Sequence, residues 1–304
     1  MNPGQRGVAI VMAMSVVALA AIATGAMMSI QSTWSRQREL EGDHAQAQLL
    51  IQAGIDWACA VLSDDRRLSN VDHLKEPWAL RLAPMPVDNG ELFGYIEDQQ
   101  GAFNLNNLVV GGKTSVVHLE RFRRLLSILN LPTNLAYALA DWIDADSDPQ
   151  PNGGAEDEYY MSLQPPYPAA NRPLTDVSEL AQVRGFTEEV RARLSPFVSA
   201  LPANTALNVN TATPEVLSAV IDRLDIDAAR SVVAQRERAY FRDVNDFSSR
   251  LPRDITVASS ELMVSSNYFL ARVRVTIGGS QARGRALLVR ADIGWPTIVW
   301  RKYQ

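Results

Sequence analysis

The sequence predicts an α+β protein in which a long N-terminal helix supports a small antiparallel sheet, and a large helical insertion interrupts that sheet. Three observations carry this prediction: an uncharged apolar run near the N-terminus, helical periodicity continuing beyond it, and two groups of strand-like segments separated by helical patterns. The 304 residues are 47% hydrophobic and 21% charged, which allows a proper core. The formal net charge of −5 argues against a nucleic-acid-binding protein.

The apolar run extends from Val8 to Ile30 without a charged residue. As a helix it would measure about 34 Å, enough to cross a hydrocarbon layer of about 30 Å. It is too long for a cleavable secretory signal, and no small-residue cleavage site ends it. Residues 8–30 are therefore predicted to form a transmembrane helix, with a plain signal anchor as the alternative. The single cysteine, Cys59, excludes an intramolecular disulfide.

The helix is predicted to continue beyond the membrane. No proline interrupts residues 8–67, and apolar residues such as Leu40 and Ile51 recur at three- and four-residue spacing. A helix ending near Leu62 would be about 80 Å long. Its second half, residues 31–66, is amphipathic, so one face should pack on the soluble part.

Strand-like segments lie on both sides of a long helical region. Before it, Phe93–Asp98 and Ala102–Asn106 alternate in polarity and are joined through a glycine, which predicts a hairpin. The helical region includes predicted helices around Leu119–Leu129 and over Leu135–Ile143. After it, strands are predicted at Tyr268–Ile277, Arg283–Ala291 and Thr297–Trp300, with Gly278 and Gly279 turning the chain between the first two.

The junction Gln5-Arg6-Gly7-Val8 resembles the leader of type IV prepilins and type II secretion pseudopilins. The resemblance implies cleavage after Gly7 by a prepilin peptidase on the cytoplasmic face, and a methylated mature N-terminus at Val8. The family usually has Glu at mature position five, where this chain has Met12. That Glu is thought to neutralise the amino terminus of the subunit ahead, so its absence suits a subunit at the tip of a fibre.

The whole layout is similar to the protein K family of type II secretion systems, the largest minor pseudopilins. The most specific segments are Asp141–Pro149, Gly153–Tyr160 and Pro165–Tyr167. The resemblance implies a pilin-like fold in the bacterial inner membrane, with the N-terminus cytoplasmic and the soluble domain periplasmic. It also implies a pseudopilus tip formed with minor pseudopilins I and J, an inner-membrane assembly platform, contact with secreted proteins, and calcium in the insertion. A minor pilin of a type IV pilus and a membrane-anchored DNA receptor are the alternatives.

On this interpretation the chain divides into six segments. These are the prepilin leader (1–7), the transmembrane helix (8–30), its periplasmic continuation (31–66), the first part of the sheet (67–112), the helical insertion (113–255) and the second part of the sheet (256–304).

An acidic loop in the insertion predicts a metal site. Seven carboxylates and no Lys or Arg lie between Asp141 and Glu158. Calcium takes six to eight oxygen ligands from flexible loops, whereas zinc prefers Cys and His. The loop is not an EF-hand, because Pro149 and Ala155 stand where that motif needs Gly and Glu. A solvated acidic loop is the alternative to a structural calcium site, for which the candidate ligands are Asp144, Asp146, Asp148, Glu156, Asp157 and Glu158.

The segment Leu207–Leu217 resembles the opening of helix-hairpin-helix DNA-binding modules. Thr213 and Pro214 predict a helix start, with Thr as the cap. Such modules grip phosphate with a glycine-rich turn, but Arg223–Asp227 contains no glycine and two acids. A packing module without DNA is therefore favoured.

The three histidines fall in separate segments, so no catalytic residue is nominated and no enzyme activity is expected.

Overall fold

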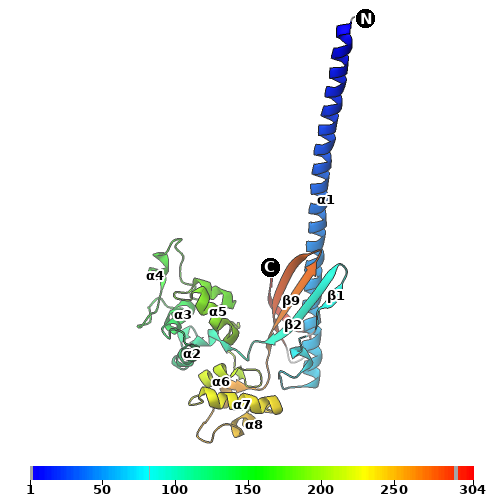
Figure 1. Ribbon diagram of the computed structural model, residues 1–304. Coiled ribbons are helices and arrows are strands. Elements are labelled where there is room, and N and C mark those ends of the chain that lie inside the picture. Colours follow the sequence, from blue (N-terminus) through cyan, green and yellow to red (C-terminus); the bar gives the residue numbers. More distant parts are fainter. Residues whose placement is uncertain (1–2, 82, 291–293) are drawn as a thin grey trace.

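The computed structural model describes residues 3–81, 83–290 and 294–304. A sheet packs on the lower half of one long helix, and a helical part lies beside the sheet and below it (Figure 1). The upper half of the long helix extends alone toward the N-terminus. The predicted α+β class, with a long N-terminal helix and an interrupted antiparallel sheet, is confirmed.

Helix α1 spans Pro3–Leu68, 66 residues without a break, so it is longer at both ends than predicted. Its large apolar side chains from Ile10 to Ile30 are 60–71% exposed. Among the described residues, α1 is the one helix long and apolar enough to cross a membrane, with a mean hydropathy of 2.2 in its most apolar stretch. The hydroxyls of Ser15 and Thr24 donate to carbonyls four residues earlier, at 2.9 and 2.7 Å, which satisfies both groups within the helix.

The lower half of α1 packs on the sheet through one face, as predicted. This face begins later than the periodicity indicates, because Leu40 is 58% exposed. Close approach of helix and sheet depends on Gly284, where a Cβ would lie 2.1 Å from Cγ2 of Ile51. The buried side chains of this face are Ala47, Ile51, Ile55, Ala58, Cys59 and Leu62.

The sheet has five antiparallel strands in the order β1-β2-β9-β10-β11. Strands β9 and β10 pair along their whole length, and the turn between them places Gly278 and Gly279 at φ values of 56° and 83°. The three predicted C-terminal strands and this turn are confirmed, although the predicted end at Ala291 lies outside the described residues. The strand bounds are Met85–Val87 (β1), Gly90–Asp98 (β2), Tyr268–Ile277 (β9), Ser280–Val289 (β10) and Thr297–Tyr303 (β11).

The predicted hairpin between Phe93–Asp98 and Ala102–Asn106 is wrong. Strand β2 pairs instead with β1 and with β9, where Asp98 lies opposite Phe269. Gln99 then donates its N–H to the carbonyl of Tyr268 at 3.0 Å, so the chain leaves the sheet beside the point where it returns. Strand β3 (Phe103–Asn104) lies in the inserted part and pairs in parallel with β6 (Val198–Ser199). Strand β3 is buried within the inserted part, and this burial outweighs local pairing.

The inserted part is built from short helices joined by long connections. The predicted helices at 119–129 and 135–143 and the helix start at Thr213 are confirmed. Its α-helices are Val116–Ile128 (α2), Leu135–Ile143 (α3), Asp157–Met161 (α4), Glu188–Leu194 (α5), Pro214–Val220 (α6), Ile226–Arg238 (α7) and Val244–Ser249 (α8). Its remaining strands are Val109–Val110 (β4), Lys113–Thr114 (β5), Leu207–Asn208 (β7) and Leu262–Met263 (β8). The 3₁₀ helices of the chain are Pro77–Ala79 (η1), Leu105–Leu108 (η2), Val177–Gln182 (η3), Ser195–Phe197 (η4) and Ser259–Glu261 (η5).

Two separate hydrophobic clusters form the interior. One joins α1 to the sheet, and the other holds the inserted part together. The second cluster includes Phe103, Leu105 and Leu108 at one end of the insertion and Leu262 at the other. By its packing, the inserted part therefore extends on both sides beyond residues 113–255.

Candidate metal centre

The acidic loop connects the end of α3 to the start of α4. Its predicted ligands Asp144, Asp146 and Glu156 come together, with one carboxylate oxygen of each within 4.8 Å of the others. Asp144 is the C-terminal cap residue of α3 and Glu156 is the N-terminal cap residue of α4, so the loop brings two helix ends to one point. Three of the six residues nominated from the sequence therefore lie together, and their role as ligands stays a prediction.

The other three predicted ligands are not part of this group. Asp148 is exposed, and its backbone N–H donates to Asp146 at 3.0 Å. Asp157 uses Oδ1 to accept the backbone N–H of Ala169 at 2.8 Å. Glu158 is exposed in the first turn of α4. The ligand set supported by the geometry is therefore smaller than the six residues nominated.

Two of the gathered carboxylates are buried and incompletely hydrogen-bonded. Asp144 and Glu156 are 1% and 4% exposed. Asp144 accepts the hydroxyl of Thr114 through Oδ2 at 2.8 Å, but its Oδ1 and both Oε atoms of Glu156 lack a hydrogen-bond partner in the described chain. A buried carboxylate without donors is costly, so this arrangement favours a bound cation.

The electrostatics agree with that reading. Burial, followed by repulsion from neighbouring carboxylates that include Asp141, Asp144 and Asp146, raises the pKa of Glu156 to about 8. Without a cation, Glu156 would therefore hold a proton near neutral pH. All candidate ligand atoms are oxygens, the donor type that hard cations such as calcium prefer.

Asp141 is a candidate residue of the metal site that is not among the six ligands predicted from the sequence. It is fully buried one helical turn before Asp144, and its carboxylate accepts the backbone N–H of Gln150, at 3.0 Å for Oδ2. Burial, opposed by the hydrogen bond from Gln150, raises its pKa to about 6. A Cβ on Gly154 would lie 2.2 Å from Oδ2 of Asp141, so the loop closes over this carboxylate only with glycine there. The i, i+3 spacing of Asp141 and Asp144 on one helix face was the available signal.

The helix-hairpin-helix-like segment is used for packing. Thr213 caps α6, Asp225 caps α7, and Arg223 takes the left-handed conformation (φ 64°) in the turn between them. Arg236 is 8% exposed and donates to the carbonyls of Val209 and Ala212 at 2.9 and 2.6 Å. This guanidinium therefore holds the chain before α6 and does not face solvent where phosphate could reach it.

Comparison with known proteins gives one consistent family. Two family models described as type II secretion system (T2SS), protein K, match residues 101–203 and 207–264. Type II secretion system protein K of Pseudomonas aeruginosa is 37% identical over 290 residues, covering 91% of this chain and 86% of the relative. The Klebsiella pneumoniae protein of the same name is 33% identical over 320 residues, covering 100% and 98%.

A solved structure has the same fold. It is a chain of the GspK-GspI-GspJ complex from the enterotoxigenic Escherichia coli type 2 secretion system, with a TM-score of 0.77 and 27% sequence identity. The match covers 88% of this chain and 99% of that chain. The resemblance drawn from the leader, the split sheet and the insertion is thereby confirmed, and the type IV pilus alternative is not supported. The chain belongs to the type II secretion system protein K family and is a minor pseudopilin with an N-terminal membrane-anchor helix.

Proposed function

We propose that this chain forms the tip of a periplasmic pseudopilus, together with minor pseudopilins I and J, and that this fibre drives export of folded proteins across the outer membrane. The observation that carries the proposal is the bulk of the inserted part, which projects sideways from the helix and sheet (Figure 1). Helical fibres grow by repeating one subunit contact along an axis. A subunit carrying this projection would block the position of the next subunit, so it fits at the end.

The membrane helix supports the same position. Met12 stands at the fifth residue after Gly7, where a fibre-internal subunit would carry Glu. Gly7 and Val8 lie in the α1 backbone, and cleavage between them by a prepilin peptidase would leave the apolar stretch at the mature N-terminus. On this proposal α1 spans the inner membrane with its N-terminus cytoplasmic, meets the assembly platform there, and later enters the fibre. The chain acts by assembly and not by catalytic turnover.

Electron microscopy of sheared pseudopili with a gold-labelled antibody to the insertion tests the tip position. We expect label at one end of each fibre, whereas label along the shaft would refute the tip position.

Intact-mass analysis after co-expression with a prepilin peptidase tests processing, and we expect loss of residues 1–7. Copurification with pseudopilins I and J in equal amounts tests the partners, which the related GspK-GspI-GspJ complex motivates.

We also propose a structural calcium ion in the acidic loop, held by Asp144, Asp146 and Glu156. The ion would offset two of the three negative charges of the clustered carboxylates and join the end of α3 to the start of α4. Asp141 would order the loop around it through Gln150. The arrangement is supported by the three buried carboxylate oxygens that lack donors.

Thermal unfolding of the full chain in detergent tests the calcium proposal. Calcium should raise the melting temperature of the inserted part relative to chelator, and this rise should be lost in the Asp144→Asn/Glu156→Gln double variant. The matched control is Glu158→Gln, which removes an exposed carboxylate in the first turn of α4, next to the loop, and should keep the rise. Identical melting with calcium and chelator would refute a structural ion.

A further inference from the structure

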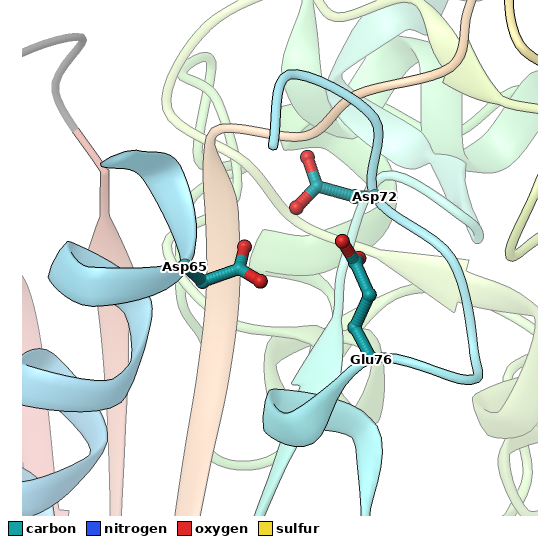
Figure 2. A group of neighbouring side chains, drawn as sticks. All are labelled: Asp65, Asp72 and Glu76. Atoms are coloured by element: carbon teal, nitrogen blue, oxygen red, sulfur yellow. The ribbon is translucent and has the colours of Figure 1, made fainter. Parts of the chain in front are cut away.

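A second group of carboxylates lies where α1 ends. Asp65 is in the last turn of α1, Asp72 is in the following connection, and Glu76 directly precedes η1. They are 7%, 1% and 7% exposed, and one carboxylate oxygen of each lies within 4.8 Å of the others. Figure 2 shows the three side chains reaching toward one another from the helix end and from the connection after it. This group is separate from the acidic loop.

Positive charge at this group comes from Arg290, at the end of β10. Its Nη1 donates to Oδ2 of Asp65 at 2.7 Å, and its Nη2 contacts Oδ2 of Asp72. Lys75 lies between two of the acids in sequence, but its Nζ contacts the carbonyl of Glu237. Among the ion pairs of the described residues, this guanidinium contacts Asp65 and Asp72, while Glu76 accepts only from neutral donors, so the repulsion among the three carboxylates is only partly offset.

The hydrogen bonds to these acids leave one oxygen without a donor. Glu76 Oε2 accepts from the backbone N–H of His73 and from Trp78 Nε1, both at 2.8 Å. Asp72 Oδ2 accepts the backbone N–H of Ser266 at 2.7 Å. Asp72 Oδ1 has no partner within the described residues, although its side chain is almost completely buried. A buried carboxylate oxygen without a donor, on a residue grouped with two further carboxylates, favours a bound cation or a proton.

We propose that Asp65, Asp72 and Glu76 bind a hard divalent cation of the calcium class. The three side chains supply only oxygen, which excludes a soft-metal site, and the remaining positions would be filled by water. Ligands from a helix end and an irregular connection suit calcium better than magnesium, which demands near-ideal octahedral geometry. Burial, with repulsion from Glu76 and Asp72, raises the pKa of Asp65 to about 6, which agrees with carboxylates that lack sufficient positive charge.

The position of the site gives the ion a structural role. The Asp72 carboxylate accepts the backbone N–H of Ser266, which precedes β9. The backbone carbonyl of Asp72 accepts a hydrogen bond from Nδ2 of Asn208, in the inserted part, at 3.2 Å. An ion on Asp65 and Asp72 would therefore fasten the end of α1 to the place where the chain returns from the insertion to the sheet. This inference does not depend on the tip position or on calcium in the acidic loop.

Counting bound calcium tests the proposal, using the full chain in detergent after removal of free ions. The Asp144→Asn/Glu156→Gln variant removes the charge of two of the three acidic-loop ligands and leaves the second group intact. We expect it to retain one calcium per chain, and we expect the further change Glu76→Gln to reduce this to none. Gln keeps an oxygen that can accept from His73 and Trp78, so this change spares those hydrogen bonds.

Two controls keep the outcomes distinct. Glu97→Gln in the same loop-variant background alters a partly exposed acid of the sheet and should leave the one ion in place. If the Glu76 variant does not fold, terbium binding to Asp65, Asp72 and Glu76 can be measured in the Asp144→Asn/Glu156→Gln variant. Excitation of Trp78 should sensitise the terbium luminescence, because its indole N–H is hydrogen-bonded to Glu76. A loop variant without calcium and without terbium emission, or a folded Glu76→Gln chain that keeps its ion, would overturn the proposal.

Discussion

The stability of the inserted part depends on the side-chain amide of Asn106. This side chain, in η2, is 5% exposed. Its Nδ2 donates to the carbonyls of Leu174 and Leu201 at 2.9 and 2.8 Å, and its Oδ1 accepts the backbone N–H of Leu174 at 2.8 Å. One amide therefore satisfies three backbone groups from two connections that have no regular partner there.

The change Asn106→Ala should destabilise the inserted part by about 3 kcal/mol. It leaves three buried backbone groups unpaired, each worth about 1–3 kcal/mol. The three groups together would cost about 3–9 kcal/mol. Water entering the vacated volume can satisfy some of them, which brings the expected loss of stability to the lower end, about 3 kcal/mol. The change also removes few apolar contacts, so lost hydrogen bonding dominates.

Hydrogen exchange at the amide of Leu174 measures the effect in the full chain. A loss of about 3 kcal/mol raises exchange through local opening by about a hundredfold. The control is Asn204→Ala, because Asn204 is exposed and its hydrogen bonds are 3.3–3.4 Å long. We expect its exchange to rise less than about fivefold, in line with a weak exposed bond. Equal exchange in the two variants would refute the reasoning.

Three further predictions concern packing and pH. Leu139→Ala, at a fully buried position of α3, should lower the stability of the inserted part by about 3 kcal/mol, as measured by hydrogen exchange. Gly284→Ala should lower the melting temperature of the helix–sheet part, because the new methyl group overlaps Ile51. The pKa of Asp246 lies below its ordinary value because the backbone N–H of residue 242 and the guanidinium of Arg250 bond its carboxylate. Its stabilising contribution is therefore present above about pH 4 and lost on further acidification, which exchange in α8 should show.

Each of these has a control. Val116→Ala alters a 73% exposed side chain and should leave exchange in the insertion unchanged. Gly94→Ala places a methyl group at an ordinary 3.4 Å from the Arg272 carbonyl oxygen, so a loss equal to that of Gly284→Ala would contradict the overlap argument. Asp246→Asn should abolish the acid-induced change in α8, and its persistence would show that another group is responsible.

Features set by local periodicity could be predicted from the sequence. The run without charge and the three- and four-residue spacing after it suffice for α1, because the helical repeat is local. The pairing of Phe93–Asp98 could not be predicted the same way. Its true partner lies about 170 residues later, and the choice depends on which core buries Phe103.

The candidate sites were predictable in part for a similar reason. Composition located the acidic loop, but only the fold shows that Asp157 is occupied by a backbone amide and that Asp141 turns inward. Asp65, Asp72 and Glu76 are spaced like ordinary surface acids. They become a group because the chain turns after α1 and because Arg290 approaches from the opposite end of the sequence.

The side-by-side exit and return of the chain at Asp98 and Tyr268 has an evolutionary consequence. Because Asp98 already faces Phe269 across the ladder, a tight turn could replace the whole intervening unit and leave β2 and β9 as a continuous hairpin. Helix α1 and the sheet thus form a scaffold onto which a helical unit could be grafted, or from which it could be deleted, in a single genetic event. Selection could then reshape the grafted unit for new contacts while α1 and the sheet keep their geometry.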